Sequence, residues 1–399
     1  MDIIITPAKL QGSVRAIASK SQAHRLLVCA AFSDKKTTLL CPETNHDIEA
    51  TADCLRSLGA QIERTDELYI VSPITCIPPK ATLHCRESGS TLRFMLPIVA
   101  ALGVDATFVM EGRLPYRPLS PLWEEMERCG CTLSRPTETT LRCTGRLIAN
   151  NCSIAGNVSS QFITGLLFAM ALTPGKSHLS VTGKIESKPY IHMTQDVLNL
   201  FGIAAEDFTV ISSLPFTSPE NITVEGDWSN AAFFLAATAI GNEVKVTGLN
   251  RESCQGDSAV SSVLPQLQQV DTVVDAADIP DLVPILAVVA GAMNGATFTN
   301  IQRLRLKESD RVATVCEMLS QLGVKTETTE KTLRVYPGQY HSCTIDSAGD
   351  HRIAMAAGIA ATVADGPITI TGAHCVSKSY PAFWDDYRYL GGQYEQHIR

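Results

Sequence analysis

Six short polar segments, each followed directly by a long apolar run, carry most of the side chains that could do chemistry. The first, Ser19–Arg25, leads into LLVCAAF, and the others begin near residues 88, 159, 228, 281 and 350. An apolar run without a charged face is typical of a buried helix. The N-terminus of a helix presents unpaired backbone N–H groups and the positive end of the helix dipole, which suit an anion. The pattern therefore predicts six buried helices with anion-binding tips.

Cations gather in and near these polar segments, although the net charge of the chain is −8. An acidic protein is a poor candidate for general nucleic-acid or membrane-surface binding, so the cations indicate a small polyanionic ligand. For any single one of them, a solvated surface charge is the alternative. The cations are Lys20, Arg25, Arg93, Arg117, Lys307, Arg311, Arg352 and Lys378.

The polar segments recur at steps that are mostly close to seventy residues, which indicates an internal repeat. A second series of amphipathic helices, each ended by a glycine, keeps the same step and ends near residues 60, 131, 203 and 324. Two helices and about four strands per period give six copies of one unit. A chain of 399 residues suits two domains, and the polar, proline-rich stretch 214–222 predicts the boundary. A strand at residues 3–5 precedes the first helix, so residues 1–11 could pair with the second half.

Two acidic residues could act in proton transfer. Asp281 stands at the head of a buried helix, where a helix cap and a general base are both open readings. The segment RLRLKESDR at 303–311 predicts a strand to Leu306 and then a helix, which places Glu308 and Arg311 on one helical face. A capping motif with a surface ion pair is the alternative.

Other segments give weaker indications. Residues 10–13 favour a turn or a crossing before the first helix. Residues 112–118 favour an irregular basic loop that is either a lid or a plain surface loop, followed by a helix capped by Ser120. The thirteen cysteines include no C-x-x-C pair, which favours buried, reduced thiols in a cytosolic protein. We expect no signal peptide, no membrane span and no metal site.

The polar segments, taken together and in order, resemble the 5-enolpyruvylshikimate-3-phosphate synthase family over essentially the whole chain. LKESDR at 306–311, GDHR at 349–352 and SKS at 19–21 form a specific combination. The resemblance also rests on Arg25, SGSTLR at 88–93, Arg117-Pro118, SSQ at 159–161, SKPY at 187–190, IPD at 279–281 and Lys378.

The resemblance implies an α/β fold of two domains, each of three βαβαββ repeats around buried parallel helices, in the manner of an inside-out barrel. We expect an N-terminal domain at 12–222 and a second domain formed by 1–11 with 223–399, with the active site in the cleft between them. It also implies a monomeric cytoplasmic enzyme without cofactor or metal. That enzyme transfers the enolpyruvyl group of phosphoenolpyruvate to the 5-hydroxyl of shikimate 3-phosphate in the biosynthesis of aromatic amino acids.

The resemblance also implies roles for individual residues. The expected contacts of shikimate 3-phosphate are Lys20, Ser21, Arg25, Ser159, Ser160, Gln161, Ser187, Tyr190, Asp281 and Lys307. The expected contacts of phosphoenolpyruvate are Lys20, Gly89, Arg117, Gln161, Arg311, His351, Arg352 and Lys378. Asp281 is the expected base at the 5-hydroxyl, and Glu308, assisted by Lys20, the expected acid at the methylene carbon. His351 is either a proton carrier or a structural histidine.

Two positions depart from the family pattern: Glu87 puts a negative charge beside a predicted anion site, and Arg303 stands where an Asn is common. Glu87 is expected to turn away or to pair with Arg93. The nearest alternative function is UDP-N-acetylglucosamine enolpyruvyl transferase, but that enzyme typically carries a cysteine in the loop that 112–118 occupies here without one. A non-catalytic anion-binding relative would be expected to lack Asp281, Glu308 or an arginine of the site. A nucleic-acid end-processing enzyme is disfavoured by the net charge.

Overall fold

The computed structural model describes residues 1–148 and 152–397, and the chain divides into two compact units. We call Ala18–Glu225 the N-unit, and Met1–Ile17 together with Gly226–Arg399 the C-unit. These limits lie a few residues beyond the expected ones because β2 (Gln11–Arg15) runs parallel to β16 (Glu243–Thr247) of the C-unit. Residues 11–13, in the segment that we expected to form a turn or a crossing, belong to strand β2.

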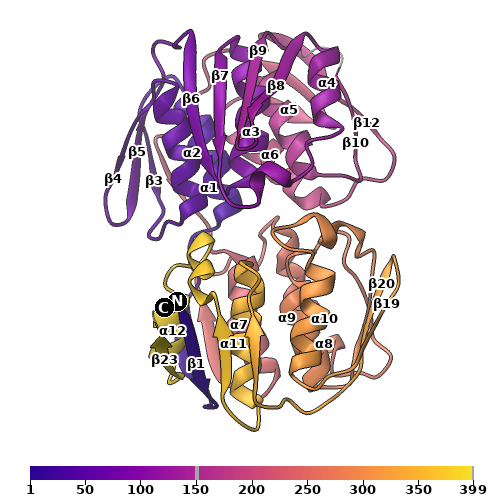
Figure 1. The fold of residues 1–399 in the computed structure, drawn as a ribbon. Helices are drawn as coiled ribbons and strands as arrows, with labels where there is room; N and C mark the ends of the chain where they lie inside the picture. The colour runs from indigo at the N-terminus through magenta and orange to yellow at the C-terminus, as the bar shows by residue number, and fades with distance from the viewer. Residues whose placement is uncertain (149–151, 398–399) are drawn as a thin grey trace. The chain divides into compact units, whose positions relative to one another are not determined.

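Three consecutive repeats of strand, helix, strand, helix and two strands make up the N-unit (Figure 1). The first consists of β15 (Asn221–Thr223), α1 (Lys20–Ala31), β3 (Thr37–Leu40), α2 (His46–Ser57), β4 (Gln61–Arg64) and β5 (Leu68–Ser72). The second consists of β6 (Lys80–Arg86), α3 (Gly89–Leu102), β7 (Asp105–Met110), α4 (Leu122–Arg128), β8 (Cys131–Thr137) and β9 (Thr140–Gly145). The third consists of β10 (Ser153–Ala155), α5 (Ser160–Ala171), β11 (Gly175–His178) with β12 (Ser180–Thr182), α6 (Lys188–Leu200), β13 (Ala204–Glu206) and β14 (Thr209–Ser212).

The C-unit repeats the design. Its first repeat consists of β2, α7 (Trp228–Ala239), β16 and α8 (Val260–Gln266). The next consists of β17 (Val273–Asp275), α9 (Val283–Ala292), β18 (Ala296–Thr299), α10 (Arg311–Gln321), β19 (Thr326–Thr328) and β20 (Thr332–Val335). The last consists of β21 (Cys343–Asp346), α11 (His351–Ala360), β22 (Ile368–Thr371), α12 (Phe383–Tyr389), β23 (Gln393–His397) and the N-terminal strand β1 (Asp2–Thr6). Short 3-10 helices are η1 (Leu114–Tyr116), η3 (Gly256–Ala259), η4 (Gln302–Leu306), η5 (Ala361–Val363) and η6 (Ala373–Lys378).

Four of the sheets in the described residues share one topology, in which a parallel pair is extended by two antiparallel strands. The order β6-β7-β9-β8 recurs as β17-β18-β20-β19. It also recurs as β15-β3-β5-β4 and as β21-β22-β1-β23, in which β15 and β1 come from distant parts of the chain. In the last of these β1 pairs antiparallel with both β22 and β23, as the sequence suggested for residues 1–11. The repeated βαβαββ fold predicted from the sequence is therefore confirmed.

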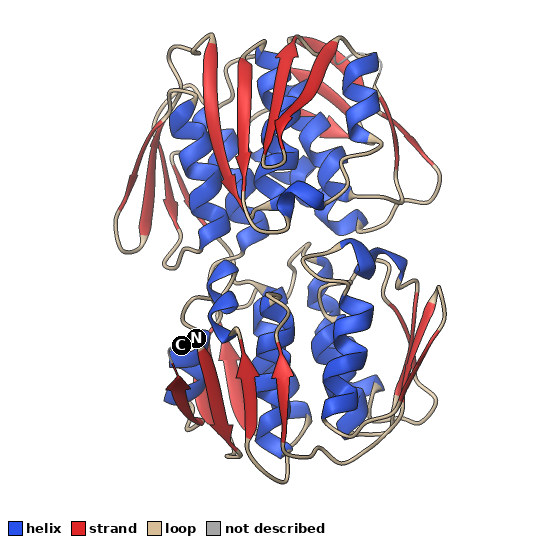
Figure 2. Cartoon of the chain, in the orientation of Figure 1, coloured by secondary structure: helices blue, strands red, loops and turns tan. Residues whose placement is uncertain are grey.

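The six predicted buried helices are α1, α3, α5, α7, α9 and α11, and the sheets lie outside them in each unit (Figure 2). Every residue of α9 from Val283 to Gly291 is buried, as an all-round apolar helix requires. Side chains of Ser19, Ser88, Ser159, Asp227 and Asp350 cap the other five helices by accepting a backbone N–H two or three residues further on. The exception is α9, which begins after Leu282 without a side-chain cap, so the capping role open to Asp281 is excluded.

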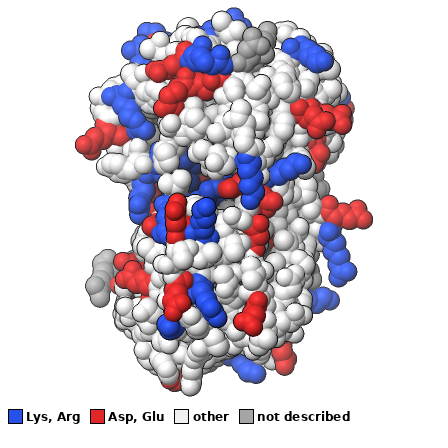
Figure 3. Space-filling model, turned by 90° about the vertical axis from the view of Figure 1, so that its right-hand side faces the viewer, with Lys and Arg blue, Asp and Glu red and all other residues white. Residues whose placement is uncertain are grey.

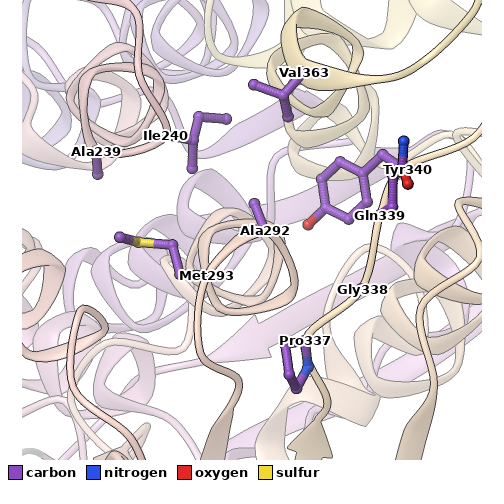
Figure 4. Close-up of a pocket in the computed structure, with 9 residues that line it drawn as sticks. All are labelled: Ala239, Ile240, Ala292, Met293, Pro337, Gly338, Gln339, Tyr340 and Val363. Atoms are coloured by element: carbon purple, nitrogen blue, oxygen red, sulfur yellow. The ribbon is translucent and has the colours of Figure 1, made fainter.

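The buried helices of the C-unit run parallel. Near their N-terminal ends Arg352 of α11 bonds to Ser229 of α7 and lies 3.6 Å from Asp281, which precedes α9. At the opposite end a pocket of about 730 Å³ lies beside the last residues of α7 and α9 (Figure 4). Its lining contains none of the expected site residues and consists of Ala239, Ile240, Ala292, Met293, Pro337, Gly338, Gln339, Tyr340 and Val363.

Two local predictions were wrong. Residues 303–306 lie in the 3-10 helix η4 and form no strand, because Asn300 adopts a left-handed φ of 58° and turns the chain after β18. Ser120 does not cap the following helix, since α4 begins after Pro121 without a side-chain capping bond. Separately, no helix among the described residues is long and apolar enough to cross a membrane.

Candidate functional site

Three cations surround the carboxylate of Asp281 in the C-unit. Arg311 Nη1 donates to Asp281 Oδ1, Lys307 Nζ lies 3.4 Å from the same oxygen, and Arg352 Nη2 lies 3.6 Å from Oδ2. Asp281 stands before α9, Lys307 before α10, and Arg352 in the first turn of α11. The ends of three helices therefore bring these predicted site residues together.

Arg311 is the centre of this cluster and is almost completely buried, with 1% of its side chain exposed. Its guanidinium also donates to Glu308 Oε2 at 2.7 Å and to Asp350 Oδ2 at 2.8 Å. Asp350 is itself fully buried, caps α11 through the N–H of Arg352, and accepts a bond from Ser309 Oγ at 2.9 Å. Asp350 thus fixes Arg311 and the start of α11 with one carboxylate.

The cluster changes the acidity of its members. Burial alone would raise the pKa of Asp281, but Lys307, Arg352 and Arg311 hold that pKa well below its usual range. Burial lowers the pKa of Lys307 to about 8, and the neighbouring Asp281 opposes a larger shift. In the absence of a ligand Asp281 is therefore a weak base, and an anion that engages the same cations would increase its basicity.

A second contact fixes Arg352. Its Nη2 donates to Ser229 Oγ at 2.7 Å, and Ser229 Oγ donates in turn to the fully buried Asp257. His351 is buried beside Asp350, with Nδ1 3.9 Å from Oδ1, and Lys378 Nζ donates to the carbonyl of Gly349 at 3.0 Å. The α11 end of the C-unit therefore holds the predicted residues His351, Arg352 and Lys378.

In the N-unit the predicted cation Lys20 forms an ion pair with Asp47 of α2 at 2.9 Å. Beneath it, His24 contacts Thr51 Oγ1 through Nδ1 at 2.7 Å, and Thr51 continues to Thr91 Oγ1 at 2.7 Å. Burial, with Lys20 and Arg25 nearby, holds the pKa of His24 well below its usual value, so the imidazole is neutral. This chain of polar groups ties the N-terminal ends of α1 and α3 together through α2.

Arg25 is also buried, and its guanidinium is bonded within the N-unit. It donates to Thr194 Oγ1 at 2.9 Å, to the Ser21 carbonyl at 2.6 Å and to the Tyr190 carbonyl at 2.9 Å. These contacts place Ser21 and Tyr190 next to each other. They also give Arg25 a role in joining α1 to α6, in addition to the ligand contact implied by the resemblance.

Gly89 and Arg117 lie in direct contact. A β-carbon on Gly89 would lie 2.7 Å from Arg117 Nη1, so the first residue of α3 leaves space for this guanidinium. A pocket of about 580 Å³ lies on the same loop and is lined in part by Arg117, Trp123 and Arg135. The loop at 112–118 contains the single turn η1, and Tyr116 at its tip is 73% exposed.

Gln161, in the first turn of α5, links two other predicted segments. Its Oε1 accepts a bond from Arg93 Nη1 at 2.6 Å, and its Nε2 donates to Ser90 Oγ at 2.8 Å. Ser159 caps this helix, and both Ser159 and Ser160 are buried. Ser187 directly precedes α6 and lies in the left-handed region, with a φ of 53°.

The carboxylate of Glu87 packs against Gly112. A β-carbon on Gly112 would lie 2.4 Å from Glu87 Cδ, so this carboxylate faces the loop at 112–118. Arg93 bonds to Gln161 and to the carbonyl of Pro118.

Charges of both signs are interspersed on the face of the molecule seen in Figure 3. Among the described residues, donors close enough to share a metal ion are Glu125, Cys129 and Cys152, and none of these is a predicted site residue.

The sequence missed the partners of the predicted residues. Asp47, Ser229 and Asp350 each contact a predicted cation, and Asp257 accepts a hydrogen bond from Ser229. Ser229 and Asp350 lie within polar segments that the repeat pattern identified, so their positions near the other predicted residues could have been inferred from the sequence. Asp47 and Asp257 lie outside these segments, and their pairing depends on tertiary contacts.

Comparison with known proteins identifies a family. The family model of EPSP synthase (3-phosphoshikimate 1-carboxyvinyltransferase) matches residues 4–387. The chain is 35% identical to the 3-phosphoshikimate 1-carboxyvinyltransferase of Clostridium kluyveri, over 99% of this chain and 98% of that one. It is 34% identical to the protein of the same name from Clostridioides difficile, over 98% of both chains.

Solved structures show the same fold. EPSP synthase from Acinetobacter baumannii superposes with a TM-score of 0.80 at 21% identity, over 99% of this chain and 100% of that one. The enolpyruvyl transferase NikO from Streptomyces tendae superposes with a TM-score of 0.75 at 16% identity, over 100% of this chain and 99% of that one.

Proposed function

Because the chain belongs to the EPSP synthase (3-phosphoshikimate 1-carboxyvinyltransferase) family, we propose that it transfers the enolpyruvyl group of phosphoenolpyruvate to the 5-hydroxyl of shikimate 3-phosphate. The products are 5-enolpyruvylshikimate 3-phosphate and inorganic phosphate. The observation that carries this proposal is the match of the whole chain to the family, together with the presence of each acid, base and cation that the reaction uses.

The C-unit cluster supports binding of phosphoenolpyruvate. The planar carboxylate and the tetrahedral phosphate of this substrate are both anions that guanidinium groups bind through paired hydrogen bonds. Arg311 and Arg352 would engage them, with Lys378 and His351 from the same end of α11. In the N-unit, Gly89 and Arg117 would contact the same substrate, together with Lys20 and Gln161.

The shikimate ester would bind chiefly to the N-unit. Ser159, Ser160 and Ser187 are hydroxyl donors near helix N-termini, a setting that favours a phosphate. Ser21, Tyr190 and Arg25 form one bonded group that would contact the carboxylate side of the ring. Asp281 and Lys307 would bind ring hydroxyls from the C-unit.

The chemistry needs two proton transfers in each direction. Asp281 takes the proton of the 5-hydroxyl as its oxygen attacks C2 of phosphoenolpyruvate, and Glu308, assisted by Lys20, protonates the methylene carbon. In the second step Glu308 takes a proton back from the new methyl group, and phosphate departs with the proton that Asp281 returns, which forms the enol ether of the product. Since Arg311 contacts both Asp281 and Glu308, binding of an anion to Arg311 would increase the basicity of both carboxylates at once.

The decisive experiment measures phosphate release from phosphoenolpyruvate with shikimate 3-phosphate or with UDP-N-acetylglucosamine as the acceptor. Release only with the shikimate ester is expected. Release only with the sugar nucleotide would assign the sister activity, and release with neither from folded protein would contradict catalysis. Asp281→Asn and Glu308→Gln should each lower kcat by roughly 10²- to 10⁴-fold, whereas the exposed Glu327→Gln should not.

The proposal extends to a monomer in the cytoplasm. None of the thirteen cysteines forms a disulfide and nine are buried, which suits a reducing compartment. Light scattering during size-exclusion chromatography measures the mass directly, and a dimer would contradict the monomer.

A further inference from the structure

Two buried thiols of the N-unit lie almost within bonding distance. Cys129 Sγ and Cys152 Sγ are 3.3 Å apart, although the residues are 23 positions apart in the sequence. Cys129 ends α4 in the second repeat, and Cys152 precedes β10 in the third. They are 5% and 1% exposed. Neither residue belongs to the proposed catalytic machinery.

We propose that Cys129 and Cys152 are a redox-modification site, at which a low-molecular-weight disulfide converts the two thiols into a reversible bond between the second and third repeats. A disulfide bond is about 2.05 Å long, so the two sulfurs need to approach by about 1.3 Å.

The reaction balances with oxidised glutathione as the oxidant. One cysteine loses its proton and attacks a glutathione sulfur, which forms a mixed disulfide and releases one glutathione thiolate. The second cysteine then displaces the remaining glutathione, so two protein thiols are oxidised and one glutathione disulfide is reduced to two thiols. Burial raises the pKa of both cysteines, so the reaction is slow near neutral pH and faster as the pH rises.

A metal site is the competing use of these residues, because Glu125 lies close enough to share an ion with them. Both Glu125 oxygens are already occupied: Oε2 accepts from Arg128 Nε at 2.8 Å, and Oε1 accepts from Arg128 Nη2 at 2.6 Å and from the N–H of Ser153. A structural zinc site normally has four ligands, and this group offers three. The contacts therefore favour the disulfide.

The bond would connect two elements that are otherwise linked by a long segment containing β8 and β9. Closing such a segment restricts the unfolded chain, so oxidation should raise the thermal midpoint of the protein by several degrees. It should leave phosphate release with both substrates nearly unchanged, because the pair contacts no proposed ligand residue.

The test must separate this pair from Cys131, which lies two residues from Cys129 and whose thiol is hydrogen-bonded to Cys143. We would therefore oxidise the full-length Cys131→Ser/Cys143→Ser protein with excess glutathione disulfide, block the remaining thiols and digest with trypsin. Trypsin does not cleave before Pro136, so Cys129 lies in a peptide of residues 129–142 and Cys152 in a peptide of residues 147–176.

We expect mass spectrometry to find these two peptides joined, separated again by dithiothreitol, and a raised thermal midpoint. Adding Cys129→Ser should abolish both effects, whereas adding Cys316→Ser in the C-unit should abolish neither. Two results, each seen in wild type as well as in the variant, would overturn the proposal. One is glutathione adducts without the joined peptides, and the other is a disulfide from either cysteine to another partner. Tight binding of one cadmium ion by the reduced protein, lost in both Cys129→Ser and Glu125→Gln, would also overturn it in favour of a metal site.

Discussion

Arg311 and Asp350 form a fully buried ion pair, with Nε and Oδ2 2.8 Å apart and side chains 1% and 0% exposed. A buried charge is tolerated only when it is paired and hydrogen-bonded. Here Asp350 also caps α11, so the cation that contacts Asp281 and the helix that carries Arg352 share one anchor. The strength of this anchor can be measured.

Asp350→Ala should lower the free energy of unfolding by about 3–5 kcal/mol, because it leaves the Arg311 charge buried and removes a helix cap. Asp350→Asn keeps a capping oxygen and should cost less. Asp310→Ala is the matched control, since Asp310 caps α10 but its side chain is 43% exposed, and it should cost about 1 kcal/mol. Equal losses for Asp350→Ala and Asp310→Ala in urea denaturation would show that the ion pair contributes nothing.

The pKa of Lys307, about 8, predicts a pH dependence of activity. As the pH rises through 8 the ammonium loses its proton, so kcat/KM for the shikimate ester should fall on the alkaline side. In Lys307→Arg the guanidinium stays charged, and this alkaline decline should disappear even if the maximal rate is lower. Lys331→Arg, at an exposed position, is the control. An alkaline decline that persists in Lys307→Arg would assign it to another group.

The same lysine predicts the pH dependence of stability. The folded pKa lies below the unfolded value of about 10.4, so between about pH 8 and pH 10.4 the unfolded chain binds more protons. The contribution of Lys307 to the free energy of unfolding is therefore unfavourable below pH 8. This destabilisation is relieved as the pH rises to about 10.4. Comparing urea denaturation of wild type and Lys307→Met at pH 7 and pH 10 isolates this effect. If the free energies of unfolding of wild type and Lys307→Met change equally between the two pH values, the predicted effect of Lys307 is contradicted.

The fold was largely predictable from the sequence because short local patterns of apolar and polar residues specify the repeat. An apolar run without a charged face specifies a buried helix, and five of the six such helices have the capping side chains that their polar segments offered. The errors arose where two signals compete. The alternation at 303–306 favours a strand, but the left-handed turn at Asn300 places these residues in a 3-10 helix.

The sequence pointed to the pairing of Glu308 with Arg311, but to none of the other ion pairs around Arg311. Arg311, Lys307 and Asp281 were identified, but sequence spacing does not reveal that Arg311 contacts three carboxylates. Asp257 acts on Arg352 only through Ser229, across a tertiary contact that no local pattern records. The role of Asp281 as a helix cap was open in the sequence and is excluded by the structure.

Gly89→Ala should weaken phosphoenolpyruvate binding with little loss of stability. The new methyl group would lie 2.7 Å from Arg117 Nη1, and this atom is the far end of a flexible side chain that can move away. Displacing a charge-assisted contact should raise KM for phosphoenolpyruvate roughly tenfold or more while the thermal midpoint stays nearly constant. Steady-state kinetics with each substrate varied in turn checks this, and an unchanged KM would mean that Arg117 is not a ligand of phosphoenolpyruvate.

Gly165→Ala should have the opposite profile, because the neighbouring atom cannot move away. A β-carbon on Gly165 of α5 would lie 2.2 Å from the backbone carbonyl oxygen of Arg93 in α3. Relieving this clash requires the two buried helices to separate, which should cost about 3 kcal/mol or more. Gly358→Ala in α11 is the matched control, since its β-carbon would lie 3.0 Å from the ring of Trp384 and only the ring needs to shift. If Gly358→Ala lowers the free energy of unfolding as much as Gly165→Ala or more, the contact between α3 and α5 is not tighter than the contact of α11 with Trp384.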